Sequence, residues 1–303
     1  MWRSPSAFTH TIPPEPAVAS TDRSGDGAGR VCAASAVPAT QLEGRPRDAC
    51  LVATKAGGST LTPDEVFADC NASLQRLGLD VIDLYQVHWH RRVVPIAETI
   101  AAMIELVRRG NVRYLGLCNS GPGDIAEATA GGAAVVSDHV VYNRRRAAGY
   151  ALTEVCQNRK IGMLCHSPLA QVLLAGRYRH PDESPADRTQ SRHFVGPRPM
   201  SRHGEPGCER AVFDAIETLR SVAGDGGLSL ADLSMARLRH RPDVACVPAG
   251  ASRPEQARAN ASAADIRLDD ALIALLDAAT EAVKRCMGPN LDMWQGGDRS
   301  RVR

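Results

Sequence analysis

The sequence predicts a parallel α/β fold, specifically a (β/α)8 TIM barrel. Short apolar runs alternate with amphipathic segments along most of the chain, and strands separated by helices form parallel sheets. The expected strand ends at Lys55, His88 and Asn119 are about 31 to 33 residues apart, close to the roughly 30 residues of one βα unit in a barrel of about 250 residues. No G-x-G-x-x-G motif follows an apolar run, so the main sequence signal of a Rossmann fold is missing.

The alternation begins near Ala49 and can be followed element by element. CLVATK predicts a strand, and the helix in TPDEVFADCNASLQRLGL has Thr62 and Glu65 at the spacing of a capping box. Further strands are expected at VIDLYQVH, VRYLGLCN, AAVVSDHVVYN, IGMLCHSPLA and VACVPAG. Further helices are expected at PIAETIAAMIELVRRG, GPGDIAEATAG, ALTEVCQNRK, ERAVFDAIETLRSVAG, SLADLSMARLRHR and DDALIALLDAATEAVKR.

Three segments differ in texture. Residues 1–43 are rich in Pro, Ser, Ala and Gly without a lasting period, and we expect them to be poorly ordered. Residues 44–285 carry the barrel pattern, interrupted by a polar, Pro-rich insertion from about Arg179 to Gly207. Residues 286–303 form a Gly-rich tail, which we expect to fray; the alternative is that it lays Trp294 over the site.

Composition restricts the class of partner. The chain has 303 residues, and its 36 basic against 34 acidic residues give a formal charge of only +2, which does not favour nucleic acid or an anionic membrane. Nine scattered cysteines without a C-x-x-C pair predict reduced thiols rather than a disulfide framework or a structural zinc site. With no secretion signal or apolar run of membrane-spanning length, we expect a cytoplasmic protein that binds a small molecule.

Polar residues stand at the ends of the expected strands. In a βα barrel the reactive groups lie at the C-terminal strand ends. The sequence offers Lys55, His88, Asn119, His139, Ser167 and the segment GASR ending at Arg253 at these positions. Lys55 is one of only three lysines in an arginine-rich chain, and a half-buried ammonium is costly unless it is paired or used in the chemistry.

His88 and His90 admit two interpretations. Residues i and i+2 of a strand face the same way and could share a divalent metal, as in a metal-dependent hydrolase. That site needs further ligands, and no acidic residue occupies a suitable strand end. The favoured interpretation is that His88 alone points into the site, while His90 is an exposed loop histidine.

Two late segments suit phosphate groups. Ser167 begins the segment SPLAQVLLAGRY after the penultimate expected strand, and GASRPEQ follows the last one. Barrels often bind phosphate in the loops after their last two strands. Arg253 beside a helix start combines a charge with backbone N–H groups, as a nucleotide 2′-phosphate requires. Taken alone, Ser252 is equally well explained as a helix cap and Arg253 as a solvated side chain.

Five ordered segments resemble one protein family. ATKAG, SLQRLGLDVIDLYQVHW, VRYLGLCNSG, IGMLCHSPLAQVLLAGRY and VPAGASRPEQARAN look like the successive signatures of the aldo-keto reductases, from about Gly44 to Val283. The resemblance implies a (β/α)8 barrel that binds NADP(H) without a Rossmann domain and reduces an aldehyde or ketone.

The resemblance also implies roles for particular residues. Lys55 and His88 resemble the catalytic lysine and histidine, with His88 orienting the substrate carbonyl and Trp89 walling the pocket. Cofactor contacts are implied for Cys118, Asn119 and His139 at the nicotinamide carboxamide, His166 at the nicotinamide ring, Ser167 and Leu169 at the pyrophosphate, and Ser252, Arg253, Gln256 and Asn260 at the adenosine phosphate and adenine.

One part of the family pattern is missing. The tyrosine that protonates the carbonyl oxygen and its aspartate belong to a D-x-A-x-x-Y segment about thirty residues before the lysine, and the first tyrosine here is Tyr85. We therefore expect a barrel incomplete at its N-terminus, with strands three to eight recognisable, and hypothesise that residues 1–43 are not family sequence. Three functions remain open: an impaired NADPH-dependent carbonyl reductase, an inactive nucleotide-binding barrel, and a metal hydrolase using His88 and His90.

Overall fold

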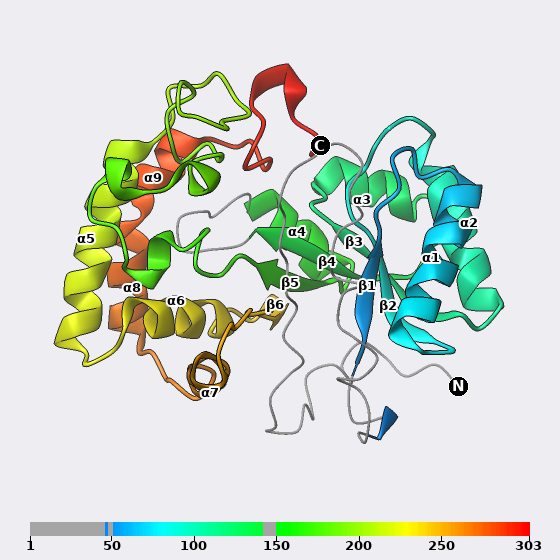
Figure 1. The fold of residues 1–303 in the computed structure, drawn as a ribbon, viewed down its shortest axis with the longest axis horizontal. Helices are drawn as coiled ribbons and strands as arrows, with labels where there is room; N and C mark the ends of the chain where they lie inside the picture. The colour runs from blue at the N-terminus through cyan, green and yellow to red at the C-terminus, as the bar shows by residue number, and fades with distance from the viewer. Residues whose placement is uncertain (1–45, 48–50, 142–149) are drawn as a thin grey trace. The chain divides into compact units, whose positions relative to one another are not determined.

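The fold of the chain is given by a computed structural model that describes residues 46–47, 51–141 and 150–303 (Figure 1). Residues 1–43, expected above to be poorly ordered, lie outside the described residues. The strands are β1 (Ala53–Ala56), β2 (Ile82–Val87), β3 (Val112–Cys118), β4 (Val135–Val141), β5 (Gly162–His166) and β6 (Val244–Cys246). The α-helices are α1 (Pro63–Leu77), α2 (Ile96–Arg108), α3 (Pro122–Thr129), α4 (Tyr150–Asn158), α5 (Glu209–Asp225), α6 (Leu230–Arg239), α7 (Pro254–Ser262), α8 (Asp270–Ala279) and α9 (Glu281–Met287). Short 3₁₀ helices are η5 (Leu173–Ala175), η6 (Pro181–Glu183), η7 (Ala186–Arg188) and η8 (Gly297–Arg299).

The described chain forms two units. The first comprises residues up to His139 together with Cys156–Gly162 and Arg303, and the second comprises Val140–Val155 and Met163–Val302. In the first unit the strands follow chain order and pair in parallel, β1 with β2, β2 with β3 and β3 with β4. In the second, β5 pairs in parallel with β6. Strands that alternate with helices and pair in parallel match the α/β class expected from the sequence.

The register of the first unit decides which side chains share a face. Lys55 of β1 pairs with Gln86 of β2, Gln86 with Gly116 of β3, and Gly116 with Ser137 of β4. Paired residues of neighbouring strands point to the same side of a sheet, so these four positions form one row. The row is crowded: a Cβ on Gly116 would collide with the Ser137 side chain and stand 3.0 Å from Gln86 Cγ.

The opposite face of these strands carries helices. The hydroxyl of Tyr85, whose position alternates with Gln86, donates a 3.5 Å hydrogen bond to the Val66 carbonyl of α1, and α1 packs on β1 while α2 packs on β3 (Figure 1). Tyr85, Val87 and Leu117 are buried on this face.

Local signals set the start and end of α1. Thr62 is the N-cap, with its Oγ1 3.4 Å from the Glu65 amide, and Gly78 closes the helix in the left-handed region. The capping box predicted from Thr62 and Glu65 forms only in part, because the Glu65 carboxylate accepts from the amides of Thr60 and Leu61. These hydrogen bonds lower the pKa of Glu65, led by the one from Thr60.

The second unit has its own hydrophobic core. Helix α5 packs on α6, α8 and α9, and α6 packs on β6. Phe194, from the polar, Pro-rich insertion, is fully buried and meets Phe213 of α5 edge-on, with ring centroids 6.3 Å apart. The final apolar stretch, expected as one helix, is two helices that meet at Thr280. No helix of the described chain is both long and apolar enough to cross a membrane.

The expectation of reduced thiols is wrong for one pair of cysteines. Cys208 and Cys286 form a disulfide, with Cα atoms 5.9 Å apart. Their separation of 78 residues gave no spacing signal in the sequence. The bond joins the N-cap of α5 to α9. Cys70, Cys118, Cys156 and Cys165 are buried, and Cys246 is half-buried.

Removing the disulfide should weaken the second unit. A bridge across a loop of this length typically contributes about 2–4 kcal/mol to the free energy of unfolding. We therefore expect Cys208→Ser to lower the urea midpoint by a corresponding amount, and reductant to do the same to the unmodified chain. Cys246→Ser, which removes a free thiol, serves as the control. Equal midpoints for the unmodified chain and Cys208→Ser would contradict the expectation.

Candidate active site

The strand ends of the first unit bring together the residues expected at the reaction centre. One step beyond the row containing Lys55, on the same face, stand Cys118 and His139, which are register partners at the ends of β3 and β4. His88 follows β2 directly, and its amide donates to the Ala56 carbonyl of β1 at 3.1 Å. By the alternation of side chains along a strand, Lys55, His88, Cys118 and His139 belong to one face.

Asn119 ties these strand ends to one another. Its backbone is left-handed, with φ +56°, a conformation that asparagine tolerates better than most residues. Its amide N–H donates to the His139 carbonyl at 3.0 Å, and its Nδ2 donates to the His88 carbonyl at 3.2 Å and to Cys118 Sγ at 3.1 Å. Asn119 therefore links the ends of β2, β3 and β4.

Lys55 is half-buried in the row beside Gln86. No carboxylate of the described chain lies within 4 Å of its ammonium group. The Gln86 amide donates to the Leu117 carbonyl at 3.1 Å. Lys55 thus presents a positive charge on the face that carries His88.

His90 differs from both expectations made for it. It lies in the loop after β2, as expected, but it is buried rather than exposed, and its Nε2 lies 2.8 Å from Ser120 Oγ. Burial lowers the pKa of His90, against the opposing influence of the Asp124 carboxylate. The described residues contain no group of three or more His, Cys, Asp or Glu side chains arranged to hold a metal ion. The metal-hydrolase interpretation therefore has no support from His90.

Asp138 is a buried carboxyl that sequence inspection missed. It is fully buried and pairs in register with Leu117, on the face covered by helices. Burial raises the pKa of Asp138 to about 8, although the amide and hydroxyl of Ser120 act in the opposite direction. Neither carboxyl oxygen has a hydrogen-bond partner among the described residues, so the influence of Ser120 is electrostatic. Its place in VVSDHVV, next to His139, was the only signal available.

In the second unit, His166 and Ser167 lie at the end of β5, where the sequence placed them. His166 Nδ1 is 3.2 Å from Ser167 Oγ. Ser167 is left-handed with φ +52°, and so are Ala170, Gln171 and Val172. Such conformations cost about 1–3 kcal/mol each and are concentrated at functional loops. The Leu169 side chain packs against the hydrophobic core of this unit, which gives it a structural role.

The expected adenosine-binding residues cluster around the first turns of α7. Arg253 is the N-cap residue and is exposed, as is Ser252. Gln256 Oε1 accepts from the Ser252 amide and hydroxyl, both at 2.9 Å, and Asn260 Nδ2 donates to the Gly250 carbonyl at 3.2 Å. The four residues thus form one local arrangement beside helical N–H groups.

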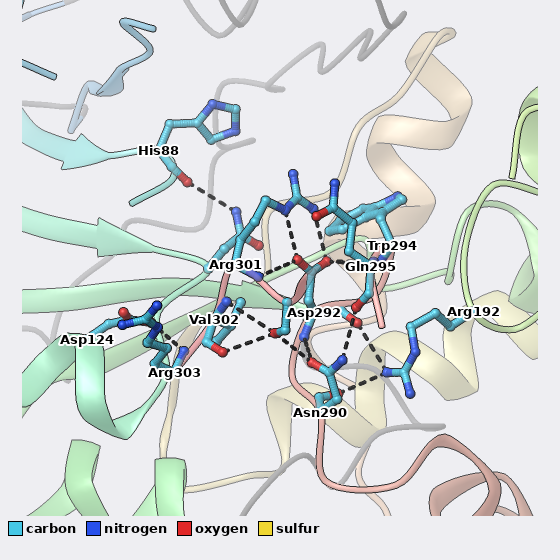
Figure 2. A network of polar contacts seen from close by, with 12 residues as sticks. His88, Asp124, Arg192, Asn290, Asp292, Trp294, Gln295, Arg301, Val302 and Arg303 are labelled. Carbon is cyan, nitrogen blue, oxygen red and sulfur yellow. Dashed lines mark hydrogen bonds and ion pairs between the residues drawn. The ribbon is translucent and has the colours of Figure 1, made fainter. Parts of the chain in front are cut away.

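The tail, expected to fray, is instead folded around Asp292 (Figure 2). The Asp292 carboxylate is buried and accepts from the amides of Trp294, Gln295 and Arg301 and, at 2.8 and 2.9 Å, from the Arg301 guanidinium. Arg192 from the insertion donates to the Asp292 carbonyl. The Trp294 ring faces His166 nearly in parallel, with centroids 6.5 Å apart.

Comparison with known proteins identifies the family. The aldo/keto reductase family model matches residues 30–281. The chain belongs to the aldo/keto reductase family. The resemblance of the five segments is thereby confirmed, and so is the expected class of enzyme, an oxidoreductase.

Three relatives are 26–29% identical to this chain over the parts that align. The NADH-specific methylglyoxal reductase of Escherichia coli K12 is 29% identical over 74% of the chain and 67% of its own length. The aldo-keto reductase yakc [NADP(+)] of Schizosaccharomyces pombe is 28% identical over 70% of the chain and 61% of its own length. L-glyceraldehyde 3-phosphate reductase of Escherichia coli K12 is 26% identical over 72% of the chain and 65% of its own length. The chain thus spans about two thirds of the length of these curated relatives.

A solved structure supports the fold. The thermostable aldo-keto reductase Tm1743, crystallised with the inhibitor epalrestat, aligns with a TM-score of 0.62 over 81% of this chain and 77% of its own, at 24% identity. The (β/α)8 barrel class predicted from the sequence is confirmed. At this identity the likeness concerns the fold alone.

The raised pKa of Asp138 predicts a pH-dependent stability. Between about pH 4 and 8 the folded chain keeps this carboxyl protonated while the unfolded chain releases the proton. Stability should therefore fall as pH rises through that window, by up to about 1.4 kcal/mol per pH unit, and level off above it. Asp138→Asn removes the titration, so the difference in unfolding free energy between Asp138→Asn and the unmodified chain should grow in favour of the variant with pH. Urea unfolding at a series of pH values measures this difference, and a constant difference would contradict the prediction.

Proposed function

We propose that this chain reduces the carbonyl group of a small aldehyde or ketone with a hydride from NADPH. One observation supports the proposal most directly: Lys55, His88, Cys118 and His139 share one face at neighbouring strand ends. The C-terminal strand ends are where barrels of this kind carry their reactive groups. We further propose, from the sequence, that the protein works in the cytoplasm on a small-molecule partner.

Lys55 and His88 have complementary roles in this proposal. His88 donates a hydrogen bond to the substrate carbonyl and so orients it. The Lys55 ammonium stabilises the negative charge that develops on the carbonyl oxygen, an effect that is large in a site shielded from water. The nicotinamide cofactor supplies the hydride when it is bound. Trp89, next to His88, is proposed to wall the pocket.

Each of the two units offers groups of the kind that a part of a nicotinamide dinucleotide requires. Asn119 and His139, with Cys118, offer amide, imidazole and thiol groups for the carboxamide. His166 offers a ring for stacking, and Ser167 with Leu169 the loop for the pyrophosphate. Arg253 is exposed at the N-terminus of the nine-residue helix α7, where charge and helical N–H groups together favour a phosphate. Ser252, Gln256 and Asn260 complete this end of the proposed site.

The source of the proton limits the proposed activity. The family tyrosine and its aspartate have no counterpart before Lys55 in the sequence. Tyr85 does not replace the tyrosine, because its hydroxyl faces α1 and burial raises its pKa far above the usual range. We propose that water supplies the proton, at a cost of about 10²- to 10⁴-fold in rate. The hypothesis that residues 1–43 are foreign to the family offers a reason for the loss, although the family match begins at residue 30 and so includes residues 30–43.

Lysine substitution tests the reductase proposal. Lys55→Met should lower kcat/KM for an aldehyde such as methylglyoxal by about 10²-fold or more, because it removes the charge that stabilises the oxyanion. Lys160→Met, which removes an exposed lysine after α4, is the matched control and should leave the rate unchanged. Loss of NADPH absorbance gives the rate, and NADPH fluorescence gives binding. Saturable binding without any turnover would favour an inactive nucleotide-binding barrel, and no binding by the folded chain would sink the proposal.

Cofactor choice depends on Arg253. The names of the relatives point both ways, one being NADH-specific and another using NADP(+). We expect Arg253→Ala to weaken NADPH binding by about tenfold while leaving NADH binding nearly unchanged, because only NADPH carries the 2′-phosphate. Arg258→Ala, one turn further along α7, is the control. Equal effects on the two cofactors would assign Arg253 to the solvated surface.

A further inference from the structure

Behind the strand ends of the first unit lies a buried polar cluster that the proposed reaction does not use. Its members are His90, Ser120 and Asp138, all buried, with the fully buried Asp124 beside them. His90 Nε2 and Ser120 Oγ are 2.8 Å apart. The neighbouring positions in the sequence, His88, Asn119 and His139, are those proposed to face the substrate and cofactor.

The backbone places the cluster on the helix-covered side. Asp138 pairs with Leu117 and therefore points to the same side of the sheet. This is the side opposite to the row containing Lys55. The left-handed conformation of Asn119 breaks the alternation after β3, so that Ser120 turns towards Asp138 and His90. The end of each of the strands β2, β3 and β4 therefore has one residue that faces the proposed site and another, one or two positions away, that belongs to the cluster.

Of the two aspartates at the cluster, Asp124 has a cationic partner and Asp138 has none among the described residues. Asp124 pairs with Arg92 and accepts from the amides of Gly121 and, as Figure 2 shows, Arg303. Glu127 of α3 also lies within 4 Å of Arg92. No cation of the described chain pairs with Asp138. Burial and the neighbouring Asp124 carboxylate both favour the neutral form of Asp138 and so raise its pKa.

The Ser120 hydroxyl has a single proton; its oxygen lies 2.8 Å from His90 Nε2, and the hydroxyl influences the Asp138 carboxyl. With Asp138 neutral, the Ser120 hydroxyl can donate to His90 Nε2. With Asp138 ionised, the hydroxyl is drawn to the carboxylate, and His90 must donate from Nε2 to Ser120 Oγ instead. The protonation of Asp138 thus sets the direction of the His90–Ser120 hydrogen bond and the tautomer of His90.

We propose that Asp138, Ser120 and His90 are positioning residues that hold the ends of β2, β3 and β4, and thereby His88, Asn119 and His139, in the geometry that binds cofactor and substrate. This inference rests on the proposed function for its catalytic consequence. The linkage among the three strand ends does not depend on it. In the mildly alkaline range, ionisation of Asp138 rearranges the cluster and displaces the residues in front of it.

Nuclear magnetic resonance can test the linkage without any assay of activity. Between pH 6 and 10 we expect the backbone amide signals of His88, Asn119 and His139 to move with one common midpoint, about pH 8 as given by the carboxyl. The ring ¹⁵N signals of His90 should report a tautomer change at the same midpoint. Asp138→Asn should abolish both responses. Ser120→Ala should leave the His139 response in place and remove those of His88 and His90.

Activity supplies the second readout. The kcat/KM of the unmodified chain should fall by about ten- to a hundredfold across the same midpoint, as expected for a small displacement of reacting groups, and that of Asp138→Asn should stay flat. Asp243→Asn is the matched control: Asp243 is also a buried aspartate, but it lies in the second unit, 3.1 Å from Arg241. It should keep the behaviour of the unmodified chain.

The outcomes are distinct. Amide signals that do not move, or that move equally in Asp138→Asn, would overturn the proposed linkage whatever the activity. Linked signals in a chain that neither binds NADPH nor oxidises it would uphold the linkage and refute the reductase function. If the amide signals move together but kcat/KM does not change across their common midpoint, the cluster has a structural role only.

Discussion

The parallel register of β1 to β4 is the constraint on which the candidate site depends. Because paired residues must point to the same side of the sheet, the pairing of Lys55 with Gln86 fixes which neighbours face the site. A slip by one residue would turn Lys55 towards the helices and bring Thr54 to the face of His88. The crowding at Gly116, between Gln86 and Ser137, opposes a larger side chain at the centre of the row.

Three buried aspartates of the first unit differ in the partners that surround them. Asp83, at the start of β2, is paired with Arg47 and Arg113 and accepts from the Val52 amide. Asp124 has Arg92 and two backbone amides. Asp138 has no such cation, and its pKa rises because burial of an unpaired charge costs more than its neutralisation. Asp83 thus stabilises the sheet through ion pairs at the start of β2, whereas Asp138 carries a titratable proton near the end of β4.

Sequence reasoning found the elements whose signal is local. Strands with apolar runs and helices with caps, such as α1 with its N-cap Thr62, were predicted close to their observed positions. It failed where partners are distant in sequence. Cys208 and Cys286 meet only because α5 packs on α9, and Arg192 reaches tail carbonyls near Asp292 across the second unit. His90 was expected to be exposed because its partner, Ser120, follows a different strand and gave no local signal.

The two faces of the first unit are not independent, because they share a backbone. Asn119 donates to His88 and His139 at the front, and the next residue, Ser120, contacts His90 at the back. A displacement of either residue must affect the other, since the two are consecutive and the backbone of Asn119 is held in the left-handed conformation. A site built on such strand ends gains rigidity from what lies behind it, and it also becomes sensitive to any charge that appears there. Among the described residues of the cluster, Asp138 is a group able to change charge, and the residue that follows it on β4 is His139.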